Sequence, residues 1–404
     1  MEDSEVIESQ AQASAPSETG KVPVATLLRF ATFFVVALGI LGGAHAYIAS
    51  RLIAGLGLTG AAAQAGWAVA ALGFLSLFLA FAARKMPLGV ARVAHLIGYS
   101  WMGLFALSLF SVTAVDLVSA VASALTHSPR WGRVEVAAVG LLVVPSAVWG
   151  AIRALGPAKV ERVDVPIANL PSELEGYRIV QVSDLHIGDT VGAAWTTRLV
   201  EQINALAPDA VAITGDVADG SAAKIRDEVA PLGGIKARDG VFFCTGNHEY
   251  FNGLGGWLGE MRRLGFQVLL NEHKVVHRGQ AKLVIAGATD HEGGGFVPEH
   301  ESRPDLALQG APQGAPRILL AHQPRTAYQA GGLGIDLQLS GHTHGGQFFP
   351  WKYFVRLQQP VLAGMADIGG VRVYTHRGTG FWGPPLRLLA PPEIAELRLV
   401  NRSP

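Results

Sequence analysis

Residues 336–347 read DLQLSGHTHGGQ, a predicted strand followed directly by a loop with two histidines and three glycines. Loops at the carboxyl ends of strands are where open α/β sheets build their sites. His342 and His344 lie two positions apart and can turn toward two neighbouring metal ions, while the glycines permit tight turns and close approach of the backbone to a ligand. The stretch therefore predicts an α/β domain with a metal site at one edge of a sheet.

Short β-branched runs continue on both sides of this stretch, from about residue 159 onward, separated by polar, glycine-rich and helical segments. This alternation is typical of an α/β domain. Predicted strands cover 178–182, 210–214, 241–245, 282–286, 317–321, 336–340 and 371–375. Between the first two, Trp195, Leu199 and Ile203 recur at every fourth position and predict an amphipathic helix, and a second short helix is expected over 255–264.

Four other predicted strands also end in potential metal ligands. These ends carry SDLH at 183–186, GDVAD at 215–219, GNHE at 246–249 and a histidine at 322. Taken singly, each is weak evidence, because a lone Asp-x-His is more often a surface accident and a lone Gly-Asp pair is usually a turn. All five sets stand in order, each directly after a predicted strand, which makes coincidence an untenable explanation.

The ligand types favour a pair of divalent metal ions. Asp184 and His186 leave their strand two positions apart, so they point the same way and can hold one ion. A carboxylate such as Asp216 has two oxygens and can bridge metals about 3.5 to 4 Å apart, as two-metal hydrolases require. Oxygen ligands mixed with imidazoles suit Mn, Fe or Zn. The single cysteine, Cys244, excludes an intramolecular disulfide and is expected to be a small buried hydrophobe.

Together these motifs resemble the calcineurin-like metallophosphoesterases over roughly residues 175–380. The resemblance implies a sandwich of two β-sheets flanked by helices. It also implies two divalent metal ions, one held by Asp184, His186, Asp216 and His344 and the other by Asp216, Asn247, His322 and His342. The long form GHTHGGQ, preceded by four apolar spans, is similar to a bacterial membrane-anchored branch of the family.

The resemblance further implies hydrolysis of a phosphomonoester or phosphodiester by a metal-activated hydroxide. His248 would contact the phosphoryl group and protonate the leaving oxygen, and would not bind metal. Asp219, three residues past Asp216, is expected either to orient a metal ligand through a hydrogen bond or to cap the start of a helix. Glu249 is expected to hold the His248 loop and to take no part in the reaction.

The N-terminal part of the chain predicts a membrane anchor. Hydrophobic residues make up 50% of the chain, charged residues 16%, and the mean hydropathy is +0.31. Four apolar stretches, at 24–48, 61–82, 93–118 and 134–154, are each long enough to cross a hydrocarbon core of roughly 30 Å. The acidic start of the chain lacks the basic region of a cleavable signal peptide. We expect a disordered tail over 1–20, a four-helix transmembrane anchor over 21–156 and a metallophosphoesterase domain over 157–404.

The basic residues around the spans predict the orientation, because loops rich in Lys and Arg stay in the cytoplasm. The side that holds both ends of the chain carries Lys21, Arg29, Arg84, Lys85, Arg92, Arg153, Lys159 and Arg162, and the other side carries Arg51, Arg130 and Arg133. The catalytic domain is therefore expected in the cytoplasm, at the inner membrane of a bacterium. Asp116 and His95 lie near opposite ends of the third span, where we expect solvated interfacial side chains.

Two further functions compete with hydrolysis. One alternative is a catalytically silent metal-binding domain that regulates its own membrane half, although the complete ligand set and His248 argue against it. A transporter is disfavoured because the spans lack charges and breaks. Lys plus Arg equals Asp plus Glu, 32 each, so no basic field exists that would draw the chain to nucleic acid. The sequence leaves the oligomeric state open.

Aromatic residues beside the metal-binding loop suggest the substrate. Residues 348–356 read FFPWKYFVR, and Phe381 and Trp382 follow the turn at 378–380. Trp and Tyr favour the headgroup level of a bilayer, where Lys352 and Arg356 can meet anionic lipid. This pattern favours a phospholipid or a lipid-linked phosphate as substrate. The alternative is that the rings pack in the domain core or against the spans.

Overall fold

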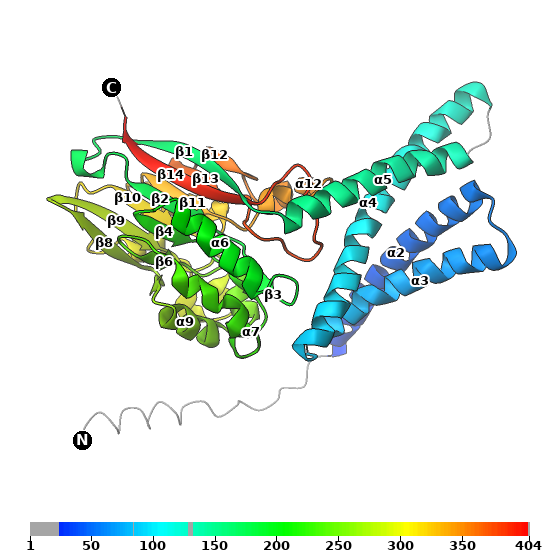
Figure 1. Cartoon of the computed structure of the whole chain (residues 1–404), viewed down its shortest axis with the longest axis horizontal. Coiled ribbons are helices and arrows are strands. Elements are labelled where there is room, and N and C mark those ends of the chain that lie inside the picture. Colours follow the sequence, from blue (N-terminus) through cyan, green and yellow to red (C-terminus); the bar gives the residue numbers. More distant parts are fainter. Residues whose placement is uncertain (1–23, 84, 128–131, 403–404) are drawn as a thin grey trace, which may run out of the picture.

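The computed structural model describes residues 24–83, 85–127 and 132–402 and has an all-helical part beside an α/β part (Figure 1). The expected tail over 1–20 lies outside the described residues. The long helices are α2 (Val24–Leu56), α3 (Gly60–Ala83), α4 (Leu88–Thr126) and α5 (Arg133–Leu155). Within the described ranges, these four helices are long and apolar enough to cross a membrane.

Helix α4 extends beyond the predicted span 93–118 at both ends. Pro87 precedes its first residue, and no further proline occurs in the helix, which ends at His127 with a left-handed conformation at the C-cap. Asp116 of α4 is half-buried, with a side chain 15% exposed, which corrects the expectation of a solvated side chain. Its carboxylate accepts hydrogen bonds of 3.0 Å from Tyr47 and Arg51 of α2, because a charge among apolar helices needs such partners.

The α/β part is built on two six-stranded sheets. The first sheet has the order β1 (Lys159–Ile167), β14 (Glu393–Asn401), β2 (Arg178–Val182), β4 (Ala210–Ile213), β6 (Val241–Phe243) and β7 (Gln267–Val268). The second has the order β12 (Gly364–Ile368), β13 (Val371–Thr375), β11 (Leu337–Ser340), β10 (Arg317–Leu320), β9 (Ala281–Gly287) and β8 (Glu272–Arg278). In the first sheet β2, β4 and β6 are parallel neighbours, and in the second sheet so are β13, β11, β10 and β9, so the carboxyl ends of these strands lie at one edge of each sheet. Strand β14 runs antiparallel to β2.

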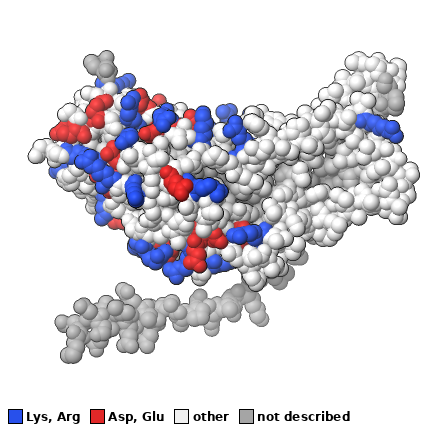
Figure 2. Space-filling model, in the orientation of Figure 1, with Lys and Arg blue, Asp and Glu red and all other residues white. Residues whose placement is uncertain are grey.

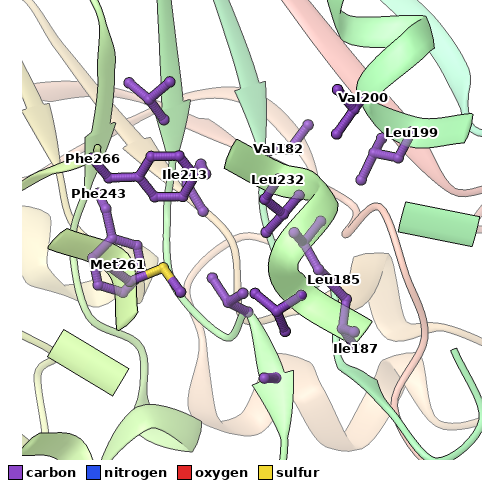
Figure 3. Packing of buried hydrophobic residues seen from close by; sticks show 14 of the residues in the cluster. Val182, Leu185, Ile187, Leu199, Val200, Ile213, Leu232, Phe243, Met261 and Phe266 are labelled. Carbon is purple, nitrogen blue, oxygen red and sulfur yellow. The ribbon is translucent and has the colours of Figure 1, made fainter. Parts of the chain in front are cut away.

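The two sheets pack face to face around one apolar core, and helices cover their outer faces. Ile179 and Phe242 of the first sheet pack with Leu283 and Leu339 of the second. On the outer face of the first sheet, Ile213 lies under a helical layer (Figure 3). That layer consists of α6 (Ala193–Ala205), α7 (Ala222–Val229) and α9 (Leu254–Arg263), and α10 (Pro304–Ala307) and α11 (Ala327–Ala330) cover the second sheet. The predicted sandwich flanked by helices is confirmed.

The α/β part packs directly on α4 through a group of buried polar contacts. His95 Nδ1 lies 2.8 Å from Asp189 Oδ2, and each of these side chains is only 5% exposed. Arg92 donates to the Asp189 carbonyl oxygen at 2.9 Å and pairs with Glu228 at 3.2 Å. The expectation of a solvated His95 is therefore wrong, because the domain covers this end of the helix.

A second contact with the long helices is made by residues after the GHTHGGQ loop and by the loop around Arg387. It combines apolar packing with one backbone hydrogen bond. The Phe349 ring lies 4.5 Å from the Phe110 ring of α4, measured between centroids. Arg387 donates its backbone N–H to the carbonyl of Gly150 in α5 at 3.0 Å. A Cβ at Gly103 would lie 3.2 Å from Pro384, so the glycine permits close packing of the loop on α4.

Candidate metal centre

The structure brings all five motif loops together at the carboxyl ends of the parallel strands. The backbone N–H of Asp184 donates to the Gly215 carbonyl at 3.1 Å, and that of Gly341 donates to the His322 carbonyl at 2.8 Å. A two-stranded parallel ribbon, β3 (Ile187–Gly188) with β5 (Ala218–Asp219), joins the first two loops. Loops separated by as many as 158 residues thus meet at one site.

Among the residues that the structure describes, potential ligand atoms form three overlapping groups, each with its atoms within 4.8 Å of one another. The groups are Asp184 with His186 and His344, Asp216 with His322 and His342, and His186 with Asp216 and His248. His186 and Asp216 each belong to two groups, so the site is continuous. Each of these residues is buried or half-buried, which protects the cluster from bulk water.

Asp216 lies between the groups. Its Oδ2 atom is 3.2 Å from His322 Nε2, 3.9 Å from His186 Nε2 and 4.0 Å from His248 Nε2. The other oxygen, Oδ1, accepts a hydrogen bond of 2.9 Å from the His248 backbone N–H. One carboxylate oxygen thus lies within 4.0 Å of three imidazoles that belong to different groups.

Asp184 joins the first group to the GHTHGGQ loop. Its Oδ1 atom lies 3.4 Å from His344 Nε2. Both carboxylate oxygens of Asp184 accept from the backbone N–H of His342, at 3.0 Å each. This contact fixes the loop against the end of β2 and brings His342 and His344 into the same cluster.

The donor atoms fit divalent metal ions. Asn247 begins α8 (Asn247–Phe251), and its Oδ1 atom is buried without a hydrogen-bond partner among the described residues. A buried carbonyl oxygen without a partner is rare in proteins, and a cation would satisfy it. Burial, followed by the charge of His322, lowers the pKa of His342 to about 3, which keeps a lone pair available for a metal. Burial raises the pKa of the Cys244 thiol, so no thiolate joins the set.

Five of the seven predicted ligands have strained backbones. Their φ angles are 53° at Asp184, 45° at His186, 54° at Asp216, 68° at His342 and 51° at His344. Residues with a Cβ rarely adopt this left-handed region, and each such residue costs of the order of 1 to 3 kcal/mol. Such strain clusters at functional sites, where the surrounding fold maintains it.

Asp219 holds two histidines with one oxygen. Its Oδ1 atom lies 2.9 Å from His186 Nδ1 and 2.6 Å from His248 Nδ1. Each ring can then donate from Nδ1 to this oxygen, which turns its Nε2 atom toward the cluster. Burial opposes the charge on Asp219, but His186 and His248 outweigh burial and lower its pKa. Ser221 is the N-cap residue of α7, so Asp219 does not cap that helix.

Glu249 connects two of the motif loops through backbone amides. Its Oε2 atom accepts from the N–H groups of Asp216 at 3.0 Å and Gly246 at 2.7 Å. Its Oε1 atom accepts from the N–H of Val217 at 2.8 Å. Burial, with the nearby charge of Asp216, raises the pKa of Glu249 to about 7. The side chain is fully engaged in holding the loops that carry Asp216 and His248.

Two residues near the cluster were not anticipated from the sequence. Asp290 follows β9, is fully buried, and has Gln323 Nε2 at 3.2 Å from each carboxylate oxygen. Asp290 follows the predicted strand 282–286, as the motif residues follow theirs, and this position could have indicated it from the sequence. Arg387 is also buried, and its side chain donates to the His344 carbonyl at 2.9 Å. It lies in a loop that carries none of the sequence motifs. No spacing in the sequence indicates this contact.

Comparison with known proteins identifies the family. A family model described as calcineurin-like phosphoesterase matches residues 177–346. The zebrafish protein named transmembrane protein with metallophosphoesterase domain is 35% identical over 320 residues, which cover 75% of this chain and 73% of that protein. The bovine protein of the same name is 37% identical over 264 residues, which cover 63% of this chain and 60% of that protein.

A bacterial relative shows the same level of similarity. An uncharacterized metallophosphoesterase of Campylobacter jejuni is 35% identical over 255 residues, which cover 62% of this chain and 65% of that protein. Because vertebrate proteins are also similar, the membrane-anchored branch is not confined to bacteria, which corrects that part of the expectation. The chain belongs to the calcineurin-like phosphoesterase family, as a metal-dependent phosphoesterase joined to four long apolar helices.

Proposed function

We propose that the protein is a membrane-anchored hydrolase that cleaves phosphomonoester or phosphodiester bonds with two divalent metal ions. The observation that carries this proposal is the position of Asp216, whose Oδ2 atom lies 3.2 Å from His322 in one group of potential ligands and 3.9 Å from His186 in another. A carboxylate shared in this way suits two metals about 3.5 to 4 Å apart. A single-metal site would not need ligand groups on both sides of one oxygen.

The residues divide into two ligand sets. Asp184, His186, Asp216 and His344 would hold one ion, and Asp216, Asn247, His322 and His342 the other. Mixed oxygen and imidazole ligands favour Mn, Fe or Zn. When bound, the two ions would neutralise phosphoryl oxygens and activate the attacking water.

His248 would act on the leaving group. Asp219 holds its Nδ1 atom at 2.6 Å, and Nε2 faces the cluster 4.0 Å from Asp216. A ring oriented in this way can give a proton to the departing oxygen. The carboxylate of Asp219 would favour the protonated ring and would keep it in position.

Hydrolysis by the full-length protein in detergent tests the proposed function. We expect release of 4-nitrophenol from an aryl phosphodiester or the corresponding monoester, with a requirement for added Mn²⁺ and loss of activity with a chelator. The control is the same protein with metal removed and then restored. A protein that binds metal and cleaves neither ester would contradict the proposal and favour the silent regulatory alternative.

The substrate is proposed to lie in the membrane. Three aromatic residues of the two stretches 348–356 and 381–382 pack inside the structure, as the packing alternative expected: Phe348, Phe349 and Phe381. Those of 351–354 remain on the surface, around α12 (Lys352–Gln358), a helix without a buried residue. The exposed fractions are 48% for Trp351, 55% for Tyr353 and Phe354, and 83% for Leu357. This surface stands next to residues that contact α4, which supports a phospholipid or lipid-linked phosphate as substrate.

Trp351→Ala is expected to lower activity selectively on lipid. Hydrolysis of a phospholipid in mixed micelles should fall roughly tenfold, equivalent to about 1.4 kcal/mol, while a water-soluble aryl phosphodiester should be cleaved at the normal rate. The matched variant Phe349→Ala removes a packed ring and should lower both activities together with the melting temperature. Equal losses on both substrates for Trp351→Ala would show that this ring has a packing role.

We also propose that the catalytic domain faces the cytoplasm. In Figure 2, Lys, Arg, Asp and Glu gather over the α/β part and are sparse over the long helices. The excess of Lys and Arg on the side of the chain ends favours a cytoplasmic position. The test is a C-terminal fusion, in bacterial cells, to a reporter that works only in the cytoplasm. We expect this reporter to be active. Activity of a reporter that requires export would reverse the orientation.

A further inference from the structure

Three exposed aromatic side chains form a wall beside His248. This aromatic wall consists of Phe251, Phe296 and Trp382, whose exposed fractions are 55%, 50% and 42%. The His248 ring centroid lies 5.5 Å from that of Phe251 and 6.1 Å from that of Trp382. Phe296 extends the wall, with its centroid 5.4 Å from Phe251. Exposed aromatic rings grouped around one histidine are unfavourable in water and mark a binding surface.

The wall is held in place by the metal-binding loop. Gln347 ends that loop, and its Nε2 atom donates to the Trp382 carbonyl at 2.9 Å. In return, the Trp382 backbone N–H donates to Gln347 Oε1 at 3.1 Å. These two bonds fix the backbone of Trp382 relative to the proposed ligands His342 and His344, so this part of the wall is preorganised.

The wall also continues into the contact between the domain and the long helices. A Cβ at Gly383, the residue after Trp382, would lie 3.0 Å from Met102 of α4. The next residue, Pro384, packs at Gly103, and Leu386 is buried with Leu107 of α4. A continuous stretch of chain therefore leads from the membrane helices to the side of the site that holds His248.

We propose that the aromatic wall is the subsite for the leaving group and that it takes the apolar part of a membrane-derived alcohol. This inference rests on the proposed function and specifies which side of the phosphate bears the lipid. Water adds to phosphorus, the bond from phosphorus to the lipid-bearing oxygen breaks, and that oxygen takes a proton from His248. The products are the remaining phosphate or phosphate ester and an apolar alcohol that can return to the membrane.

Aromatic rings can also stack on a nucleobase, so a nucleoside is the competing leaving group. The structure favours a lipid because Trp382 lies in the loop that packs on α4 and because Phe296 adds a third exposed ring, with its centroid 5.4 Å from that of Phe251. A hydrocarbon chain needs such an extended apolar surface, whose contribution grows with the area that it covers.

Substrates that differ only in the position of the chain test the subsite. The full-length protein in lipid nanodiscs is given 4-butylphenyl and 4-octylphenyl phosphate and their methyl diesters, where the chain departs with the phenol. These butyl and octyl compounds are the first pair, measured both as monoesters and as methyl diesters. In the second pair, butyl phenyl phosphate and octyl phenyl phosphate, phenol is the leaving group and the alkyl chain stays on phosphorus. We expect kcat/KM to rise at least tenfold from butyl to octyl in the first pair, and less than twofold in the second. The para-alkyl groups leave the acidity of the phenol nearly unchanged, so chemistry alone would give equal rates.

Variants of the wall separate this subsite from general hydrophobic attraction. Trp382→Ala and Phe251→Ala should each reduce the octyl-to-butyl ratio of the first pair to below threefold, and Trp382→Phe should retain most of it. Tyr328→Ala removes an aromatic ring that is 64% exposed on α11 and should leave both the ratio and the rate unchanged.

Three results would overturn the leaving-group assignment. An equal gain in kcat/KM from butyl to octyl in both pairs would indicate partition into the membrane. A preference for a nucleoside over 4-octylphenol as leaving group would assign the wall to a base. An unaltered octyl-to-butyl ratio in both alanine variants would show that the wall does not bind the chain. The absence of any hydrolysis, with metal bound, would instead refute the proposed function itself.

Discussion

Asp216→Asn is expected to abolish phosphoesterase activity through loss of metal, with kcat/KM lower by at least three orders of magnitude, equivalent to about 4 kcal/mol. The amide is nearly the same size as the carboxylate but has no charge to share between two cations. Asp216 Oδ2 faces His186 and His322, so its replacement weakens both ligand sets together. Metal content, measured by mass spectrometry of the purified protein, should fall with the activity.

A matched variant controls for the loss of a carboxylate as such. Asp305 is 46% exposed and pairs with Arg303 at the surface, away from the metal ligands, so Asp305→Asn should keep normal metal content and normal activity. If Asp216→Asn retained both metals and full activity, the carboxylate would not be the bridging ligand.

His248→Asn is expected to lower turnover by roughly two orders of magnitude or more while metal content stays near normal. The reason is geometric, because Asp219 holds the ring at Nδ1 and turns Nε2 toward the cluster. His248 also falls in a group with His186 and Asp216 whose ligand atoms lie within 4.8 Å of one another. The variant therefore distinguishes a proton donor from a ligand.

For His248→Asn, turnover and metal content are measured on the same preparation. The control is His277→Asn on β8, which removes a histidine away from the site. Metal loss equal to that of Asp216→Asn would assign His248 as a ligand. A larger deficit for an ester with a basic leaving alcohol than for one with 4-nitrophenol would support its role as a proton donor, because a basic leaving group needs the proton more.

The sequence predicted the ligand-bearing edge of the sheets well. Strands 178–182 and 371–375 agree with β2 and β13 residue for residue, and α9 differs from the predicted helix by one residue at each end. These elements are buried on one or both faces, so their apolar pattern is strong. The motif residues follow such strands directly, and the parallel arrangement then brings their loops together.

The edge strands escaped prediction for a physical reason. β1 reads KVERVDVPI and carries charges on its exposed positions, which weakens the strand pattern of a segment that lies at the sheet edge. It pairs with β14, which comes from the other end of the domain, and such long-range pairing leaves no local signal. The same limit applies to Asp189, whose contact with His95 depends on the position of a whole helix.

The backbone of the site could not be predicted either. Nothing in an Asp-x-His or His-x-His spacing requires positive φ angles, yet the predicted ligands Asp184, His186 and His344 adopt them. The loop that carries Asp216 is held in this form by Glu249, whose carboxylate accepts hydrogen bonds from buried backbone amides. The aromatic stretch 348–354 also divided in a way that composition does not determine, since Phe349 packs on α4 while Trp351 stays exposed.

Every step proposed for the reaction requires that one continuous cluster holds two metal ions and uses both for hydrolysis. The most direct measurement is titration of the metal-free, full-length protein with Mn²⁺, following bound metal and hydrolysis of an aryl phosphate ester in the same samples. We expect activity to stay low up to one ion per chain and to reach its plateau at two. Full activity at one ion per chain, or no hydrolysis at two, would contradict the two-metal site.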